Sequence, residues 1–199
     1  MQDQIHDDVK PYRRAEFEID AIFINRWSPR AFSSEAIDDE VLHRVFEAAR
    51  WAPSSFNEQP WRFIVARSET ERARFVEFLV PANQAWAKDA PVLIAIVSKK
   101  TFSHNDTPNA VYQFDAGCAW GYLSLAAAQN GLITHGMAGF DRDKAREVLG
   151  LPDGFEVLAM VALGKHGDPE QLSEELLARE VPSDRRPQQE SVMQGEFKV

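Results

Sequence analysis

The stretch Val92-Leu93-Ile94-Ala95-Ile96-Val97 is an unbroken apolar run that is rich in β-branched residues. Such a run predicts a strand covered on both faces, because a strand with one solvent face would alternate apolar and polar side chains. Two covered faces require helices on both sides of the sheet. The sequence therefore predicts a layered α/β arrangement around one sheet of four or five strands.

Helical and strand-like patterns alternate on both sides of this run. The expected helices are 17–25, 39–51, 69–79, 112–129 and 141–149, and the expected strands are 61–66, 92–97, 132–134 and 156–163. Asp38 is a suitable N-cap for the second helix, and Pro53 ends it. Helix 112–129 is apolar over most of its circumference and must be buried all round, either in the core or in a subunit interface.

Length and composition favour one domain. The chain has 199 residues, of which 44% are hydrophobic, and this is enough for a substantial core. We expect a single domain over 1–199, with a core at 17–187, a loose polar arm at 1–16 and a C-terminal extension at 181–199.

Charge and cysteine content limit the partners and the compartment. The net charge of −9 disfavours nucleic acid and anionic membranes, which need a basic face, but it leaves room for a small anion held by a few arginines. Cys118 is the single cysteine and cannot form an internal disulfide. Residues 1–10 are polar and acidic, unlike a signal peptide, so we expect a cytoplasmic protein.

Several familiar catalytic motifs are missing. The chain has no phosphate-binding P-loop, no Gly-x-Gly-x-x-Gly fingerprint and no Gly-x-Ser-x-Gly nucleophile elbow. The five histidines form no metal-spaced pair, and Cys118 lies in an apolar helix, where a core role is favoured. We therefore expect no metal site and no side-chain nucleophile.

Three polar segments remain as candidates for binding. Arg26-Trp27-Ser28-Pro29-Arg30 offers two guanidinium groups and a hydroxyl that suit a phosphate, although solvated loop ends carry the same residues. Residues 53–61 offer amide and hydroxyl groups for the edge of a planar heterocycle, but they are also typical of an ordinary turn. Arg185-Arg186-Pro187 places two cations in an acidic region, where solvation is the common outcome.

Taken together, the three segments resemble the nitroreductase family of FMN-dependent NAD(P)H oxidoreductases. The resemblance covers about residues 22–187 and rests on Arg-x-Ser-x-Arg-x-Phe at 26–32, Pro-Ser-Ser-x-Asn-x-Gln-Pro-Trp at 53–61 and Arg-Arg-Pro at 185–187. Supporting matches are Asn83 six residues before Asp89, the Gly139-Phe140-Asp141 turn and Leu163-Gly164.

The resemblance implies a fold and an assembly. The fold would be nitroreductase-like and of the α+β class, with a central mixed β-sheet flanked by helices in three layers, α/β/α. Two chains would form a domain-exchanged homodimer with two FMN molecules at the subunit interface. Helix 112–129 would be the central helix of that dimer.

The resemblance also implies the contacts of FMN. Arg26 and Ser28 would hold the phosphate together with Arg185 or Arg186. Trp27 would contribute through its backbone. Arg30 would approach the pyrimidine side of the flavin, where a cation stabilises the reduced ring.

Two further segments complete the implied cofactor site. The turn that would reach the flavin of the partner subunit contains Pro53, Ser54, Ser55, Asn57 and Gln59. Asn83 would bond the edge of the ring. Gly139, preceded by Ala138, would let the backbone approach flavin N5.

The implied activity needs no catalytic side chain. Hydride would pass from NADH or NADPH to flavin N5 and then, in a ping-pong cycle, to a planar acceptor such as a nitroaromatic or a quinone. Two alternatives stay open: a specialised flavin enzyme of the same fold (an oxidase, dehalogenase or enoate-type reductase) and a noncatalytic flavin-binding dimer.

The sequence departs from the family pattern at two positions. Ala138 stands where many members have a glutamate, and Trp86 stands where a lysine is common. Trp86, Phe102 and His104 are candidates for the roof of the substrate pocket. These departures leave the acceptor and the preferred pyridine nucleotide open.

Overall fold

The computed structural model describes residues 4–197, and its strands form one four-stranded sheet. The strands are β1 (Trp61–Ala66), β2 (Val92–Lys99), β3 (Ile133–Met137) and β4 (Phe155–Gly164), in the spatial order β1-β2-β4-β3. The sequence located all four strands, β1 with its bounds and the others to within a few residues. This arrangement, with helices around one sheet, confirms the α+β class.

All three strand pairings are antiparallel, so the mixed sheet expected for one chain is wrong for the described residues. The connection from β1 to β2 returns the chain to the end of the sheet that it left. It contains two helices, and Ala66 at the end of β1 pairs with Leu93 near the start of β2. The connection from β3 to β4 does the same with a single helix, and Met137 at the end of β3 pairs with Met160 in β4.

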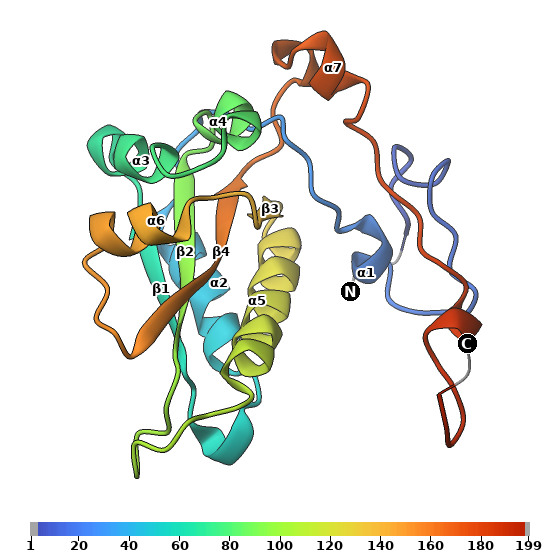
Figure 1. The fold of residues 1–199 in the computed structure, drawn as a ribbon. Coiled ribbons are helices and arrows are strands. Elements are labelled where there is room, and N and C mark those ends of the chain that lie inside the picture. The colour runs from blue at the N-terminus through green and yellow to red at the C-terminus, as the bar shows by residue number, and fades with distance from the viewer. Residues whose placement is uncertain (1–3, 198–199) are drawn as a thin grey trace.

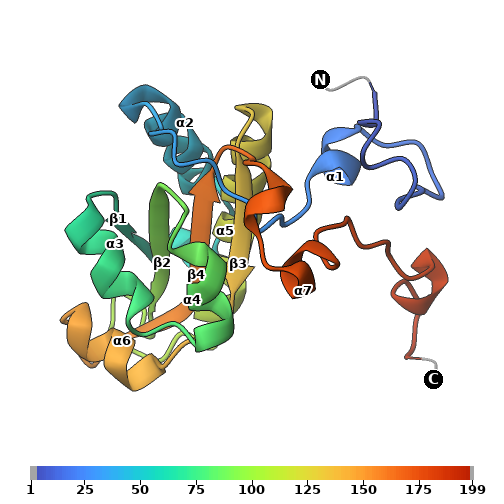
Figure 2. The same ribbon diagram turned by 90° about the horizontal axis from the view of Figure 1, so that it is seen from above.

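The helices form a layer on each face of the sheet, as Figures 1 and 2 show. One layer contains α2 (Asp39–Arg50) and α5 (Tyr112–Gln129). The other contains α3 (Glu69–Val76), α4 (Pro81–Ala87) and α6 (Arg142–Val148). The three-layer prediction is therefore confirmed.

Two helix predictions need correction. The expected helix 69–79 ends at Val76, and α4 follows because Pro81 suits the first turn of a new helix, where its missing N–H costs nothing. The expected helix 17–25 is helical only over α1 (Ile22–Asn25). Asp38 occupies the N-cap of α2 in extended backbone, but its side chain makes no capping hydrogen bond.

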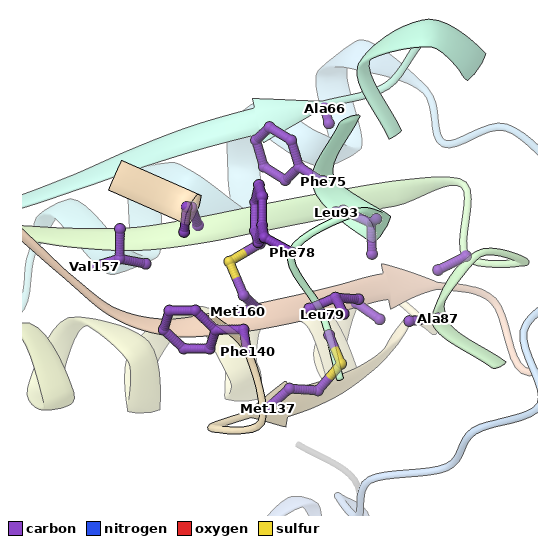
Figure 3. Close-up of a cluster of buried hydrophobic side chains, with 14 of the residues drawn as sticks. Ala66, Phe75, Phe78, Leu79, Ala87, Leu93, Met137, Phe140, Val157 and Met160 are labelled. Carbon is purple, nitrogen blue, oxygen red and sulfur yellow. The ribbon is translucent and has the colours of Figure 1, made fainter. Parts of the chain in front are cut away.

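The core divides along β2. Val92, Ile94 and Ile96 join the apolar cluster under α2 and α5, while Leu93 and Ala95 join the cluster under the other helices. Figure 3 shows Leu93 in this second cluster, with Phe75, Phe78 and Met160. Both clusters also include side chains of β4. The apolar run at 92–97 is therefore buried on both faces, as expected.

The two ends of the chain lie together beside the sheet (Figures 1 and 2). After β4 the chain passes through α7 (Glu174–Leu177) and then runs beside α1 and the N-terminal arm. The arm is docked rather than loose: Val9 is fully buried, and the Gln188 N–H donates to Glu16 Oε2 at 3.1 Å. Residues 1–3 of the arm and 198–199 of the extension lie outside the described residues.

Two features are absent from the described residues. No helix in residues 4–197 has both the length and the apolar character needed to cross a bilayer. Over the same residues, no three side chains of His, Cys, Asp or Glu are grouped as metal ligands would be.

Candidate functional site

Arg26 and Arg185 form the centre of a positive cluster. Arg26 directly follows α1, and the C-terminal tail brings Arg185 within electrostatic range of it. Burial lowers the pKa of Arg26, and the charge of Arg185 lowers it further. The ion pairs among the described residues include none to Arg26 or Arg185, so no carboxylate of these residues is paired directly with either cation.

Arg13 belongs to the same cluster and was missed by the sequence analysis. It lies in the N-terminal arm and is only 9% exposed. Arg13, Arg185 and Arg186 line a cavity of about 670 Å³ between the arm and the tail. No local pattern marks Arg13, because its surroundings come from segments distant in the sequence.

The segment that follows Arg26 is held by β3 and by the start of the C-terminal tail. The ring of Trp27 meets the ring of His166 edge-on, with 5.8 Å between centroids. The carbonyl of Pro29, next to Ser28, lies 3.0 Å from Nδ1 of His135. Burial lowers the pKa of His135, so its imidazole is neutral at pH 7, and Nδ1 carries the proton that it donates to Pro29.

Arg30 has a carboxylate partner that the sequence analysis did not identify. Glu180 Oε1 accepts from the backbone N–H groups of Arg30 and Ala31 at 2.6 and 2.8 Å, and Glu180 Oε2 lies 3.7 Å from Arg30 Nη1. The Glu180 side chain is 1% exposed. Arg30 is therefore fixed in backbone and side chain, and its charge is partly balanced.

The turn at 53–59 has a rigid and unusual backbone. Phe56, Asn57 and Gln59 have φ values of 52°, 55° and 49°, in the left-handed region that non-glycine residues rarely adopt. Ser54 Oγ accepts from the Gln59 N–H at 2.9 Å, and the Ser55 N–H donates to Asp115 Oδ2 at 3.1 Å. Backbone strain of this kind persists where the surroundings enforce it, and it is common at binding sites.

Side-chain contacts complete this turn. Gln59 Nε2 donates to the backbone oxygen and to the Oδ1 of Asn57, both at 3.0 Å, and Pro53 is exposed. Phe56 is 83% exposed, with its ring edge-on to Phe102 at 5.7 Å. The turn therefore presents an aromatic face to its surroundings.

Asn83 and Gly139 come together on the opposite side of the molecule from this turn. Asn83 Nδ2 donates to the carbonyl of Gly139 at 3.0 Å, and the Val80 N–H donates to the same oxygen at 3.1 Å. A Cβ on Gly139 would lie 2.9 Å from both Asn83 Nδ2 and Val80 Cγ2, so only glycine allows this approach. Ala138 precedes it with an exposed side chain.

One chain does not bring all the predicted residues to one place. In Figure 1, the turn containing Ser55–Asn57 lies at one end of α2 and α5, α4 with Asn83 lies at the other end, and α1 lies to the side. Of the three residues predicted for the roof of the substrate pocket, Trp86 does not fit, because it is 2% exposed and packs against Phe32 in the core. Phe102 and His104 lie near Phe56.

Comparison with known proteins places this geometry in a family. The model of the nitroreductase family matches residues 24–84 and 76–165. The chain belongs to the nitroreductase family. This membership confirms the resemblance, and the matched residues include the first two of the three polar segments.

The chain is also similar to individual proteins, two of them solved structures and one a curated sequence relative. A structure described as an oxidoreductase containing FMN is 41% identical, with a TM-score of 0.89 and coverage of 94% of this chain and 96% of that one. A nitroreductase family protein from Clostridium novyi NT is 26% identical, with a TM-score of 0.67 and coverage of 79% and 89%. The NADH dehydrogenase of Thermus thermophilus is 29% identical over 172 residues, which cover 71% of this chain and 83% of the relative.

Replacing Gly139 with alanine should destabilise the protein. The new methyl group would displace Asn83 or Val80, and overpacking of this kind costs about 1–3 kcal/mol. Urea unfolding of Gly139→Ala measures the loss. Gly154→Ala is the matched control, because a Cβ there meets no atom within 4 Å, and equal stability of the two variants would contradict the close approach.

Replacing Glu180 with alanine should also destabilise the protein. The backbone N–H groups of Arg30 and Ala31 would lose their acceptor, and an unsatisfied buried donor costs about 1–3 kcal/mol. The measurement is again the free energy of unfolding in urea. Glu175→Ala removes an exposed carboxylate from α7 and should change that energy by no more than about 0.5 kcal/mol.

Proposed function

We propose that this nitroreductase family member is an FMN-dependent oxidoreductase that takes hydride from NADH or NADPH and reduces planar acceptors such as nitroaromatics and quinones. The observation that carries the proposal is the contact between the segment that begins at Arg26 and the tail that contains Arg185, which Arg13 joins through the carbonyls of Arg26 and Ser183. The ion pairs of the described residues include none to Arg26 or Arg185. Two partly shielded cations favour a dianion such as a phosphate monoester. The FMN-containing relative supports FMN as the source of that phosphate.

The residues of the cluster suit the phosphate end of FMN. Arg26 and Arg185 supply guanidinium groups, and Ser28 supplies a hydroxyl and a backbone N–H. When bound, FMN would supply the hydride-transfer chemistry between the nicotinamide and the acceptor, so the protein would need no nucleophile of its own. Arg186 lines the adjoining cavity and is the alternative to Arg185 as the second arginine.

Arg30, Asn83 and Gly139 suit the flavin ring. Glu180 holds Arg30 in one orientation. Arg30 would then keep a cation near the pyrimidine side of the flavin, and Glu180 would partly balance the charge of that cation. The Gly139 carbonyl accepts hydrogen bonds from Asn83 and Val80. These bonds fix the glycine backbone and the Asn83 side chain before a ligand binds. Fixed polar groups lose less entropy on binding than mobile ones.

A homodimer would complete the site. The turn at 53–59 lies far from α1 within one chain, its backbone is strained and its Phe56 is exposed. Exposed aromatic residues continue onto α5, where Phe114 is 73% and Tyr122 is 44% exposed. We therefore place the turn of one subunit at the flavin of its partner, with FMN at the interface.

Purified protein should be yellow, with the visible spectrum of bound flavin, and NADH or NADPH should bleach it in the absence of oxygen. Bleaching followed by reoxidation with a quinone supports the proposed activity. Bound flavin that neither nucleotide bleaches would favour a specialised flavin enzyme of this fold. Protein that is colourless and cannot be loaded with FMN would contradict the proposal.

Arg26→Ala should weaken FMN binding about 10- to 100-fold, because a charge-assisted hydrogen bond contributes about 1.5–3 kcal/mol. Quenching of FMN fluorescence on binding measures the dissociation constant. Arg44→Ala removes an exposed arginine from α2 and serves as the control. Equal affinity of the two variants for FMN would remove Arg26 from the site.

A further inference from the structure

Arg13 links three segments through one buried guanidinium. Its Nη1 donates to the carbonyls of Ile24 and Arg26 at 2.6 and 2.7 Å, and its Nε donates to the carbonyl of Ser183 at 2.8 Å. The bonded segments are the end of α1, the first residue of the polar segment 26–30 and the C-terminal tail. One side chain in the arm therefore sets the backbone from which both Arg26 and Arg185 extend.

The surroundings of this guanidinium are short of negative charge. A buried cation is usually balanced by a carboxylate, but the partners of Arg13 are neutral carbonyl oxygens. Burial and then the charges of Arg185 and Arg26 lower the pKa of Arg13 to about 10, and Asp184 opposes this shift. The side chain therefore stays charged at neutral pH, within a cluster of three arginines that carries a net positive charge.

The remaining groups of Arg13 are available to a ligand. Nη2 makes none of the three hydrogen bonds, so two charged N–H groups are left. Arg13 also lines the cavity of about 670 Å³ that Arg185 and Arg186 line. Arg14, Glu16 and Asp184 line the same cavity, so its arginines outnumber its carboxylates. An anion at this point would offset the remaining positive charge and give these N–H groups an acceptor.

We propose that Arg13 is a positioning residue for the phosphate of FMN. It fixes the backbone at Arg26 and Ser183 so that Arg26 and Arg185 face one anion, and it adds a third positive charge to the attraction. This inference rests on the proposed function, because the phosphate that it concerns is that of FMN. The arm at residues 4–16 thereby becomes part of the cofactor site.

The test compares FMN with riboflavin, which has the same ring and no phosphate. The quantity measured is the ratio of the two dissociation constants, obtained by flavin fluorescence for each variant. Arg13→Gln should weaken FMN binding relative to riboflavin binding by about tenfold or more, which moves this ratio toward one. The reason is that the substitution affects only the binding of the phosphate. Arg44→Gln, which removes an exposed arginine from α2 and does not line this cavity, should leave the ratio within about twofold.

A fall in affinity for both flavins by the same factor would make Arg13 a general brace and would overturn the proposal. An Arg13→Gln ratio equal to that of the wild-type protein would also overturn it. Wild-type protein that binds neither flavin would instead overturn the proposed function. The two failures are therefore distinguishable.

A second variant keeps the proposal testable if Arg13→Gln does not fold. Asp184→Asn removes an exposed carboxylate that opposes the positive cluster, and it leaves the three hydrogen bonds of Arg13 in place. The preference for FMN over riboflavin should then rise about two- to fivefold at low salt. An unchanged or smaller preference would overturn the role assigned to the cluster.

Discussion

Ile94 and Ala95 are both fully buried although they point to opposite faces of the sheet. This double burial requires an apolar layer on each side of β2, and the helices supply it. With both faces of the sheet covered, polar groups that bind ligands have to lie at its ends, at its edges or on the segments that leave it. Ser54, Gly139 and Arg26 are at such positions, and each is held there by backbone hydrogen bonds or by close packing.

The elements that the sequence predicted well are those whose signals are local. Strand 61–66 and helix 112–129 have the predicted bounds because their own patterns and the flanking breakers define them. The break between α3 and α4 was missed, since apolar residues continue through Leu79 and Val80 and only Pro81 marks a new start. The direction of the strand pairing was also beyond the sequence, because β1–β2 and β3–β4 are both antiparallel although two helices separate the first pair and one helix separates the second.

The residues of the candidate site also differ in whether a short stretch of sequence could predict them. Arg26, Ser28 and the turn at 53–59 were found because their chemistry is visible in a short window of sequence. Arg13 and Glu180 were not, because an arginine in a polar arm and a glutamate in a charged tail look solvated in sequence. Their burial arises from contacts between positions that are about 150 residues or more apart in the chain. Position in the tertiary structure, rather than residue type, gives these two their roles.

The contact between Arg13 and Ser183 has a consequence for the two ends of the chain. Removing residues from Ser183 onward would take away one acceptor of a buried guanidinium near the other terminus, and Val9 and the rest of the arm would lose the tail beside them. The arm and the tail are therefore expected to open together rather than separately. A bulky tag or a protease acting at either end would disturb both ends at once.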